Sequence, residues 1–509
     1  MNWVKKKKLP AIKTIKYNGQ QCLDINDLWH ALHSTFNTAS NCQVDTSTLD
    51  KISDKPTIPW PEFSREEFKF TLSSCNNSSA PGPDKLLWNH LKTIFEDIEC
   101  LDSFIWMANA CINLGYWPSH FKISNTIVIP KPNKKSYSSP KSFRPIVLLN
   151  TMGKLIKKVI GERLQFYSVS NDFIHPSQLG GLNFKSMIDT GITLTHTIRT
   201  GWVKNLTTST LAFDIAQFFP LLNHQLLSLI IKKVDFDQPI SSFFTDYLVN
   251  RKTNYSWTSF SSPTFNINVR VGQGSVLSPI LSALYLSLFI YILENRLKNL
   301  KIPTSFTSFI DDGLFISQSN SIDISISRLY CSYNVLTNLL EKFGLVVEHS
   351  KTEIFHFNRS HGVFNPPPLN LSPLGENVLL PSNTWKYLGF IFDRKLTFHQ
   401  HVDFYMNKAI STVKCMKLLG NSNRGINPLQ KHLLYRMCIL PIALYGFQLW
   451  FYNHAPTAYH MKILNKMQRH AAIWILGAFK TFPSYGIEAI VGLIPIKLHL
   501  QKLGGRSQL

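Results

Sequence analysis

The sequence is poor in the patterns that mark several common classes of protein. None of its eight cysteines forms a C-x-x-C pair, so neither a zinc ribbon nor a zinc knuckle is indicated. Scattered single cysteines instead suggest buried thiols in a reducing compartment. The first residues lack the apolar stretch of a secretory signal peptide. Acidic residues are scarce too, with 31 Asp and Glu against 53 Lys and Arg, a formal net charge of +22. Such a surplus favours a polyanionic partner, either nucleic acid or an anionic membrane surface.

Long uninterrupted apolar runs are also missing. The best candidate for a membrane span, residues 276–293, contains three serines and a proline, which favours a buried helix. We therefore expect no membrane partner. No repeat or low-complexity tract occurs beyond the run Lys5–Lys8. That run is compatible with a nuclear import signal, and hence a nuclear location, or with a solvated basic tail of a cytoplasmic ribonucleoprotein.

The sequence contains enough apolar residues to form several packed subdomains. Its 509 residues are 44% hydrophobic and 17% charged, which is typical of a globular chain. Strand-like and helix-like segments are mixed, which predicts an α+β fold. We divide the chain into a basic tail and lead-in (1–60), a large mixed region (61–380), a strand pair (381–398) and a helical, basic C-terminal region (399–509).

The stretch 304–317 carries two adjacent carboxylates, Asp311 and Asp312. Apolar and hydroxyl side chains alternate before them, which predicts two strands joined by a tight turn. We place the turn at Asp312 and Gly313, because both residue types tolerate positive φ. An ordinary hairpin would explain the pattern. However, neighbouring carboxylates among bulky apolar residues repel one another unless a cation neutralises them, and a divalent metal is the common solution.

A third carboxylate, Asp214, follows a predicted strand, residues 210–213, at its C-terminal end. Helix capping would account for an acid there, but active sites of α/β proteins also lie at strand ends. Three carboxylates from two strands can hold two divalent cations about 3.5–4 Å apart. Magnesium fits, because it takes oxygen ligands and leaves positions open for phosphates.

Basic and glycine-bearing loops supply candidate binding groups. Lysines and an arginine gather in residues 130–149, a predicted hairpin, and suit a triphosphate or a nucleic-acid backbone, although a merely soluble surface is the alternative. Residues 270–279 form a glycine-bearing loop that leads into the apolar helix, where glycine lets the backbone approach a ligand. Ser64 begins a capping box, and Asp84 is expected to cap a helix over residues 85–95.

Seven motifs occur in the order typical of one family, and together the sequence resembles the reverse transcriptase domain of non-LTR (LINE-type) retrotransposons over about residues 60–480. The motifs are Ala80-Pro-Gly-Pro-Asp84; Ile129-Pro-Lys-Pro132 with Phe143-Arg-Pro-Ile146; Phe213-Asp-Ile-Ala-Gln-Phe-Phe219; Gly272-Gln-Gly-Ser-Val-Leu-Ser-Pro279; Phe309-Ile-Asp-Asp312; Lys351-Thr-Glu353; and Tyr387-Leu-Gly-Phe390.

The resemblance implies a right-hand polymerase that copies RNA into DNA, with an RNA template, a DNA primer or target and dNTPs as partners. Fingers and palm would occupy 61–380, a primer grip 381–398 and a helical thumb 399–509. The implied roles are metal binding by Asp214, Asp311 and Asp312 with the Ile215 carbonyl; triphosphate binding by Arg144 and Lys131, or by Lys134 or Lys135; contacts to the nucleotide by Gln273 and Gly274; a steric gate against a 2′-hydroxyl at Phe219; proton donation by Lys351; and a primer grip at Tyr387, Leu388 and Gly389. The implied cofactor is a pair of Mg²⁺ ions, which Mn²⁺ could replace.

Two alternatives remain open at the level of sequence. A viral-type RNA-dependent RNA polymerase shares the three acids, but a bulky ring at Phe219 should exclude ribonucleotides. A catalytically inactive retrotransposon remnant would only bind nucleic acid through its positive charge. Residues 1–60 are too few for the endonuclease that often precedes the polymerase, and no RNase H or cysteine–histidine knuckle follows. We therefore expect these domains to be separately encoded or lost.

Overall fold

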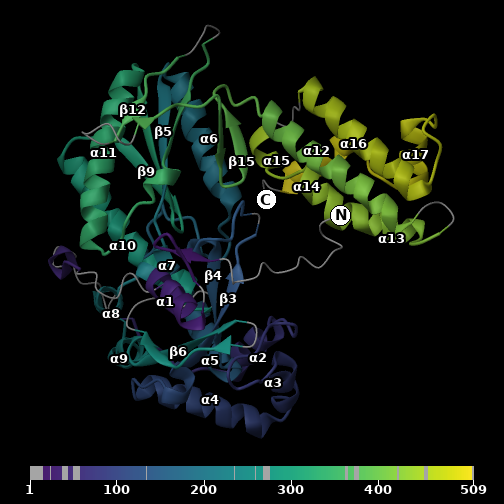
Figure 1. Ribbon diagram of the computed structural model, residues 1–509. Coiled ribbons are helices and arrows are strands. Elements are labelled where there is room, and N and C mark those ends of the chain that lie inside the picture. The colour runs from purple at the N-terminus through teal and green to yellow at the C-terminus, as the bar shows by residue number, and fades with distance from the viewer. Residues whose placement is uncertain are drawn as a thin grey trace.

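A computed structural model describes residues 15–22, 24–36, 44–49, 58–132, 134–233, 236–257, 260–267, 275–360, 365–371, 378–420, 424–451 and 457–506. Figure 1 shows three parts: a central sheet backed by long helices, a lower lobe around β3, β4 and β6, and a helical lobe on the right in green and yellow. We call them the palm, the fingers and the thumb. Lys5–Lys8 lie outside the described residues.

The palm is built on a four-stranded antiparallel sheet in the order β11-β5-β10-β9. Its strands are β5 (Thr207–Asp214), β9 (Thr304–Phe309), β10 (Asp312–Ser319) and β11 (Glu353–Phe357). Successive side chains of a strand point to opposite faces, and both faces are covered. Leu211 and Phe315 belong to one buried cluster, whereas Ala212, Leu314 and Ile316 belong to a second one that extends into the thumb. The sheet therefore joins two cores.

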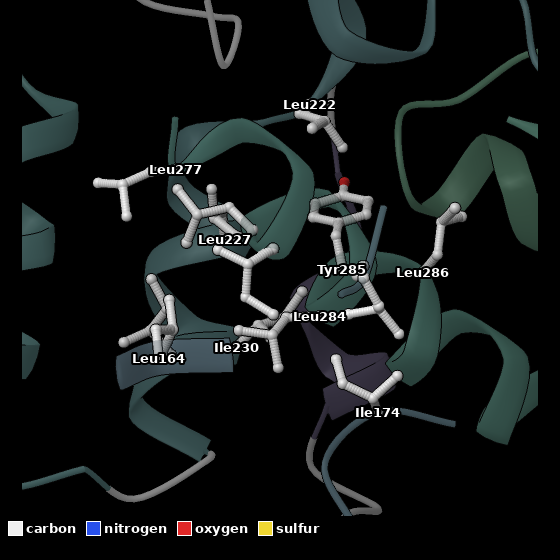
Figure 2. Packing of buried hydrophobic residues seen from close by; sticks show 14 of the residues in the cluster. Leu164, Ile174, Leu222, Leu227, Ile230, Leu277, Leu284, Tyr285 and Leu286 are labelled. Carbon is white, nitrogen blue, oxygen red and sulfur yellow. The ribbon is translucent and has the colours of Figure 1, made fainter. Parts of the chain in front are cut away.

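Helices fill the first of these cores. Leucine and isoleucine side chains from α5 (Thr151–Ser170), α8 (His224–Lys233) and α10 (Ser278–Asn299) interlock there (Figure 2). Among the described residues α10 alone is long and apolar enough to cross a membrane, but 67% of its apolar window is buried in the protein. This agrees with the buried helix expected from its serines and proline. Helix α11 (Ile322–Lys342) also covers the sheet.

The fingers carry a second sheet in the order β4-β3-β6-β7, with β8 also paired to β6. Strands β3 (Ile123–Pro130) and β4 (Phe143–Leu149) are antiparallel, as the predicted basic hairpin requires, and β6 (Arg251–Trp257) runs parallel to β3. Helix α1 (Ile25–Phe36) packs on this sheet through Leu28, Ala31 and Leu32, spaced to lie on one helical face. The lead-in thus folds back onto the fingers (Figure 1).

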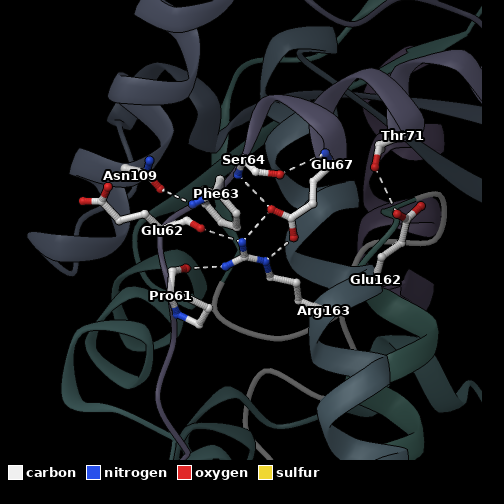
Figure 3. Close-up of polar contacts among 9 residues, drawn as sticks. All are labelled: Pro61, Glu62, Phe63, Ser64, Glu67, Thr71, Asn109, Glu162 and Arg163. Atoms are coloured by element: carbon white, nitrogen blue, oxygen red, sulfur yellow. Dashed lines mark hydrogen bonds and ion pairs between the residues drawn. The ribbon is translucent and has the colours of Figure 1, made fainter.

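A partly buried arginine ties the start of the fingers together (Figure 3). The Arg163 guanidinium on α5 donates to both oxygens of Glu67, at 2.5 and 2.6 Å, and to the backbone oxygens of Pro61 and Glu62. Although burial raises the pKa of the Glu67 carboxyl, hydrogen bonds from Arg163 and Ser64 lower it overall. Ser64 and Glu67 form the predicted capping box of α2 (Arg65–Ser73), so this prediction is confirmed.

The thumb begins with the hairpin of β14 (Thr384–Tyr387) and β15 (Phe390–Asp393), the predicted strand pair. The helices that follow are α12 (His399–Met416), α13 (Pro428–Leu434), α14 (Leu440–Ala443), α15 (Phe447–Trp450), α16 (Ala458–Leu476), α17 (Ser484–Val491) and α18 (Ile496–Arg506). Their apolar faces form the second core with the palm helix α6 (Met187–Val203).

The remaining described helices and strands complete the fold. They are α3 (Trp88–Ile94), α4 (Ile98–Asn113), α7 (Phe218–Leu221), α9 (Gln238–Leu248), β1 (Lys16–Tyr17), β2 (Gln20–Gln21), β7 (Phe260–Ser261), β8 (Phe265–Ile267), β12 (Leu369–Asn370) and β13 (Val378–Leu379).

The predicted position of the acidic turn is wrong by two residues. Phe309 pairs with Asp312, so the turn consists of Ile310 and Asp311, and Ile310 carries the positive φ of 58°. Gly313 instead lies inside β10, where an added Cβ would come within 2.3 Å of the Phe213 ring. The glycine is needed for space beside an aromatic ring and not for the turn.

Two further expectations are corrected. Asp84 does not cap the following helix, because Lys85 has a positive φ of 55° and α3 starts only at Trp88. Its carboxylate instead accepts the Thr151 amide at 2.5 Å and so caps α5. The cysteines are also not uniformly buried. Three of the seven described thiols are exposed, at positions 100, 331 and 438.

Arg163→Ala should lower the free energy of unfolding by about 1–3 kcal/mol, because the partly buried Glu67 carboxylate loses its charged partner and keeps only the Ser64 amide. Urea unfolding of the purified chain measures this. The matched control is Arg65→Ala, which breaks an exposed pair whose Arg and Asp102 side chains are 52% and 40% exposed and should cost less than about 1 kcal/mol. Equal losses would contradict the importance of the partly buried network.

The protein should lose stability as the pH falls from about 6.5 to about 4. Burial lowers the pKa of His356 to about 4, and its Nδ1 lies 2.7 Å from the Ser209 hydroxyl. The unfolded chain therefore binds a proton in this window that the folded chain does not, at a cost of up to about 3 kcal/mol at pH 4.

The measurement is the slope of unfolding free energy against pH. His356→Gln should flatten only part of that slope, because burial also lowers the pKa of His460 to about 4 and lowers the pKa of His401 and His499, and those contributions remain. An unchanged slope in His356→Gln would show that His356 is protonated in the folded protein.

Candidate active site

Strand pairing brings the three predicted carboxylates to one end of the palm sheet. Asp214 ends β5 and lies directly opposite Asp312, the first residue of β10. Asp311 occupies the turn before it, and its carbonyl oxygen accepts the Ile215 amide at 3.0 Å. The Asp214 carbonyl oxygen accepts the Glu348 amide at 2.8 Å. Backbone hydrogen bonds therefore fix all three acids relative to one another.

A buried glutamine that the sequence reading did not single out holds the acidic turn. The Gln178 Oε1 accepts from the Gly180 amide and the Ser308 hydroxyl, both at 3.1 Å, and from the Ile310 amide at 3.4 Å. An added Cβ on Gly180 would come within 2.4 Å of the Ile310 nitrogen. The segment around Gln178 is thus fitted to the turn that carries Asp311. Its signal in the sequence, a glutamine before two glycines, is visible but not specific.

The site is electrostatically strained by its own negative charges. Burial and the Asp214 charge raise the pKa of the Asp311 carboxyl. Burial, then the charges of Asp311 and Asp214, raise the pKa of Asp312 to about 7. Lys351 forms an ion pair with Asp214. Although burial lowers the pKa of this lysine, the hydrogen bond and charge of Asp214 raise it overall. The ammonium group is therefore the positive charge that balances the acids.

Within the described residues no group of three His, Cys, Asp or Glu side chains is arranged to hold a metal ion. The Lys351 ammonium group contacts an Asp214 carboxylate oxygen at this site. The donor chemistry nevertheless fits a hard divalent cation, since carboxylate and carbonyl oxygens converge here. The raised pKa values of Asp311 and Asp312 are relieved by added positive charge.

The acids open onto a cleft of about 730 Å³ between palm and fingers. Asp214 and Asp311 line it, whereas Asp312 does not. Asp312 instead raises the pKa of Tyr387 in the thumb hairpin, after the larger effect of burial. The two adjacent acids therefore face different surroundings: Asp311 faces the cleft, and Asp312 lies closer to the thumb.

Basic side chains form the opposite wall of this cleft. Lys131, Lys134 and Arg144 line it, together with Lys141, whereas Lys135 does not. Burial, then the charges of Lys134, Arg144 and Lys351, lower the pKa of Lys131. Cationic side chains close enough to lower the pKa of Lys131 form a positive surface that attracts a polyanion. Of the two alternatives to Lys131 considered from sequence, only Lys134 reaches the cleft.

The cleft also has parts that the sequence reading missed or that the structure does not describe. Thr35 and Phe36, at the end of α1, line it. The apolar spacing of α1 could have predicted the helix, but nothing local indicates where the helix packs. Gln273 and Gly274 lie outside the described residues, so their contact with a nucleotide stays a prediction.

Phe219, the predicted gate, lies in the short helix α7 and lines the same cleft. Its ring packs beside that of Phe218, with 5.5 Å between centroids, and the Gln217 backbone before them is left-handed with a φ of 47°. Packing of this kind restricts the ring to few positions. The cleft therefore has a bulky, fixed side chain close to Asp214.

The predicted primer grip is a two-residue hairpin. Its turn residues Leu388 and Gly389 have φ values of 47° and 85°, and their carbonyl oxygens accept hydrogen bonds from the hydroxyls of Tyr445 and Tyr405, at 3.1 and 2.8 Å. Tyr387 itself is buried. Leu388 and Gly389 are partly exposed, and their contact with a primer stays a prediction.

Comparisons with known proteins agree with this arrangement. A family model described as Reverse transcriptase (RNA-dependent DNA polymerase) matches residues 129–392, more than half of the chain. A probable RNA-directed DNA polymerase from transposon BS of Drosophila melanogaster is 25% identical over 433 residues, covering 82% of this chain and 45% of the relative. A corresponding polymerase from the Drosophila melanogaster X-element is 24% identical, covering 87% and 47%.

A third relative, the RNA-directed DNA polymerase from mobile element jockey of Drosophila melanogaster, is 25% identical and covers 77% of this chain and 42% of its own length. The chain thus spans about half the length of the curated relatives it matches. A solved apo telomerase from Candida tropicalis has 15% identity and a TM-score of 0.38 over 54% of this chain and 53% of its own, which is too weak a likeness to align the two site by site.

The resemblance expected from the seven motifs is confirmed by these matches, and the antiparallel palm sheet with its helices is the α+β architecture that it implied. The chain belongs to the reverse transcriptase (RNA-dependent DNA polymerase) family.

Proposed function

We propose that this chain is the RNA-directed DNA polymerase of a non-LTR retrotransposon, a nucleotidyltransferase that extends a DNA 3′-hydroxyl on an RNA template with dNTPs. The observation that carries the proposal is one cleft with the carboxylates Asp214 and Asp311 at its floor and the cations Lys131, Lys134 and Arg144 on its wall. Acids that attract metal and bases that attract triphosphate are the two halves of a nucleotidyl-transfer site.

Asp214, Asp311 and the Ile215 carbonyl would hold two Mg²⁺ ions, with Asp312 as the carboxylate behind them. Bound there, the cations would lower the pKa of the primer hydroxyl and stabilise the pyrophosphate leaving group. Lys131 and Arg144 would bind and orient the triphosphate. The Lys351 Nζ, whose pKa is raised by Asp214, would carry a proton at neutral pH and could donate it to the leaving pyrophosphate once it separates from the carboxylate.

The non-enzymatic alternative is a remnant that only binds nucleic acid. The ordered arrangement of the acids in the cleft argues against it. Strand register, the Gln178 contacts and the ion pair with Lys351 all keep the acids in place. The nuclear location proposed from Lys5–Lys8 depends on the sequence alone.

The test is primer extension on an RNA template with dNTPs and Mg²⁺. Asp214→Asn and Asp311→Asn should each reduce the rate by about 10³-fold or more, because several kcal/mol of charge stabilisation in the transition state would be lost. Asp312→Asn should reduce it less, because that carboxyl does not line the cleft. Asp323→Asn, an exposed acid on α11, is the matched control and should extend normally.

A second readout separates loss of metal from loss of fold. In the presence of a dNTP, Mn²⁺ should raise the thermal unfolding temperature of the wild type, but not that of Asp214→Asn or Asp311→Asn. If the wild type binds template–primer yet extends nothing in Mg²⁺ or Mn²⁺, the remnant interpretation is correct.

Phe219→Ala should increase incorporation of ribonucleotides relative to deoxyribonucleotides by about tenfold or more, because a change of even one methylene in a pocket alters discrimination by at least that much. Phe219→Tyr keeps the bulk and should discriminate like the wild type. Single-nucleotide incorporation with dNTP and NTP pairs measures the ratio. A wild type that uses both equally well would instead support an RNA-dependent RNA polymerase.

A further inference from the structure

The thumb contains a second cavity, separate from the polymerase cleft. It measures about 290 Å³ and is enclosed by α13, the turn after it, α14, α16 and the α17–α18 region, helices of the right-hand lobe in Figure 1. This is just below the ~300–1,000 Å³ of pockets that enclose a drug-sized ligand. Its size therefore suits one compact group and not an extended segment.

One wall of the cavity is a π-helical turn, Tyr435–Ile439. Its cause lies in the sequence: Pro441 has no N–H to give to the carbonyl four residues earlier, and its ring crowds that carbonyl. The Leu440 amide instead donates to the oxygen of Tyr435, five residues back. Such wide turns are rare and are frequently found at functional sites. Here the turn carries Tyr435 and Arg436 on the cavity wall.

The floor of the cavity is apolar and its buried polar groups are satisfied. Tyr435, Leu493 and Ile496 are 2%, 8% and 1% exposed. The Tyr435 hydroxyl donates to Gln468 Oε1 at 3.1 Å, and Gln468 Nε2 donates to Glu488 Oε1 at 2.9 Å. Since these polar groups hydrogen-bond to one another, the floor presents an apolar surface and needs no polar ligand group.

The rim, in contrast, is basic. His432, Arg436, His499 and Lys502 line the cavity, and no acidic residue among those described does so. Glu488 lies behind Gln468. Burial, then the charges of Arg436 and Lys502, lower the pKa of His499. Within the described part of the chain no ion pair within 4 Å engages Arg436 or Lys502. The mouth of the cavity is therefore an uncompensated site of positive charge.

We propose that this cavity takes one unstacked nucleotide of a bound single strand, with its phosphate on Arg436 and Lys502 and its base against the apolar floor. The choice of a nucleotide rests on the proposed function, which supplies a nucleic-acid partner. It also rests on charge complementarity, because an anionic head joined to a flat apolar body matches a basic rim over an apolar floor. Either the RNA strand or the DNA strand could supply it.

The experiment measures binding and not extension, so that it can fail independently of the polymerase. Fluorescence anisotropy with labelled single-stranded RNA and DNA of one sequence gives the dissociation constant at several salt concentrations. The charge variant is Arg436→Gln with Lys502→Gln. Its matched control is Lys462→Gln with Lys466→Gln, which removes the same charge from exposed positions of α16 outside the cavity. A third variant, Ile494→Trp, fills the mouth without changing charge.

The charge variant should weaken binding by about tenfold and lower the slope of log K against log salt by about 0.7, as expected for one lost phosphate contact on a single strand. The control should change binding by less than about threefold. Ile494→Trp should weaken binding by about tenfold, because the indole takes up the space that the base would fill and keeps the base from the floor of the cavity. Unchanged melting temperatures verify that each variant is folded.

Two results would overturn the proposal. Equal losses in the charge variant and its control would show that only overall charge matters. If Ile494→Trp binds as tightly as the wild type while the charge variant binds more weakly, only the phosphate contacts the rim and no base enters the cavity. The bound nucleotide comes from the strand, RNA or DNA, whose affinity falls more in the cavity variants. If the chain gives these binding results but does not extend a primer, the polymerase proposal is refuted and the nucleotide-binding proposal is retained.

Discussion

Repulsion among three carboxylates is the constraint on which the centre of this protein depends. Pairing of β5 with β10 sets Asp214 opposite Asp312, and the turn adds Asp311 beside them. Half-buried negative charges this close together are unfavourable without a counter-charge, and Lys351 supplies one. The surrounding structure keeps the acids together against that cost, through backbone hydrogen bonds to Asp214 and Asp311 and through the Gln178 side chain.

The other parts of the fold are arranged around this end of the sheet. The fingers bring Lys131 and Arg144 across the cleft, and α1 closes its edge with Phe36. The thumb core continues from the face of the palm sheet that carries Ala212 and Leu314. One sheet therefore contributes residues to both large cores. The Tyr387 hairpin stands between the two.

Much of the palm could be predicted from sequence because its signals are local. Strand alternation and adjacent acids identify β9 and β10, and Ser64 with Glu67 identifies the start of α2. The errors arose where a residue acts over a distance. Asp84 caps a helix 67 residues further along the chain, and Gly313 makes room for a ring on another strand. The turn was misplaced because an Asp-Gly pair usually signals a turn.

The residues of the candidate site likewise fall into those that the sequence could predict and those that it could not. Asp214, Asp311 and Lys351 could be found from motifs, and the structure brings them together. The difference between Asp311 and Asp312 could not, because adjacent residues in a sequence carry no information about which one faces a cleft. Nor could the thumb cavity be predicted, since its basic rim is assembled from Arg436 and Lys502 on different helices.

The ion pair between Lys351 and Asp214 has a consequence for how the cleft is loaded. A lysine on the same chain is always present, so it competes with any free cation for the Asp214 carboxylate at a fixed effective concentration. A cation arriving alone must displace it, whereas one arriving with a triphosphate also offers the ammonium group new oxygens. In the polymerase proposed above, the tethered lysine would favour metal accompanied by nucleotide over metal alone.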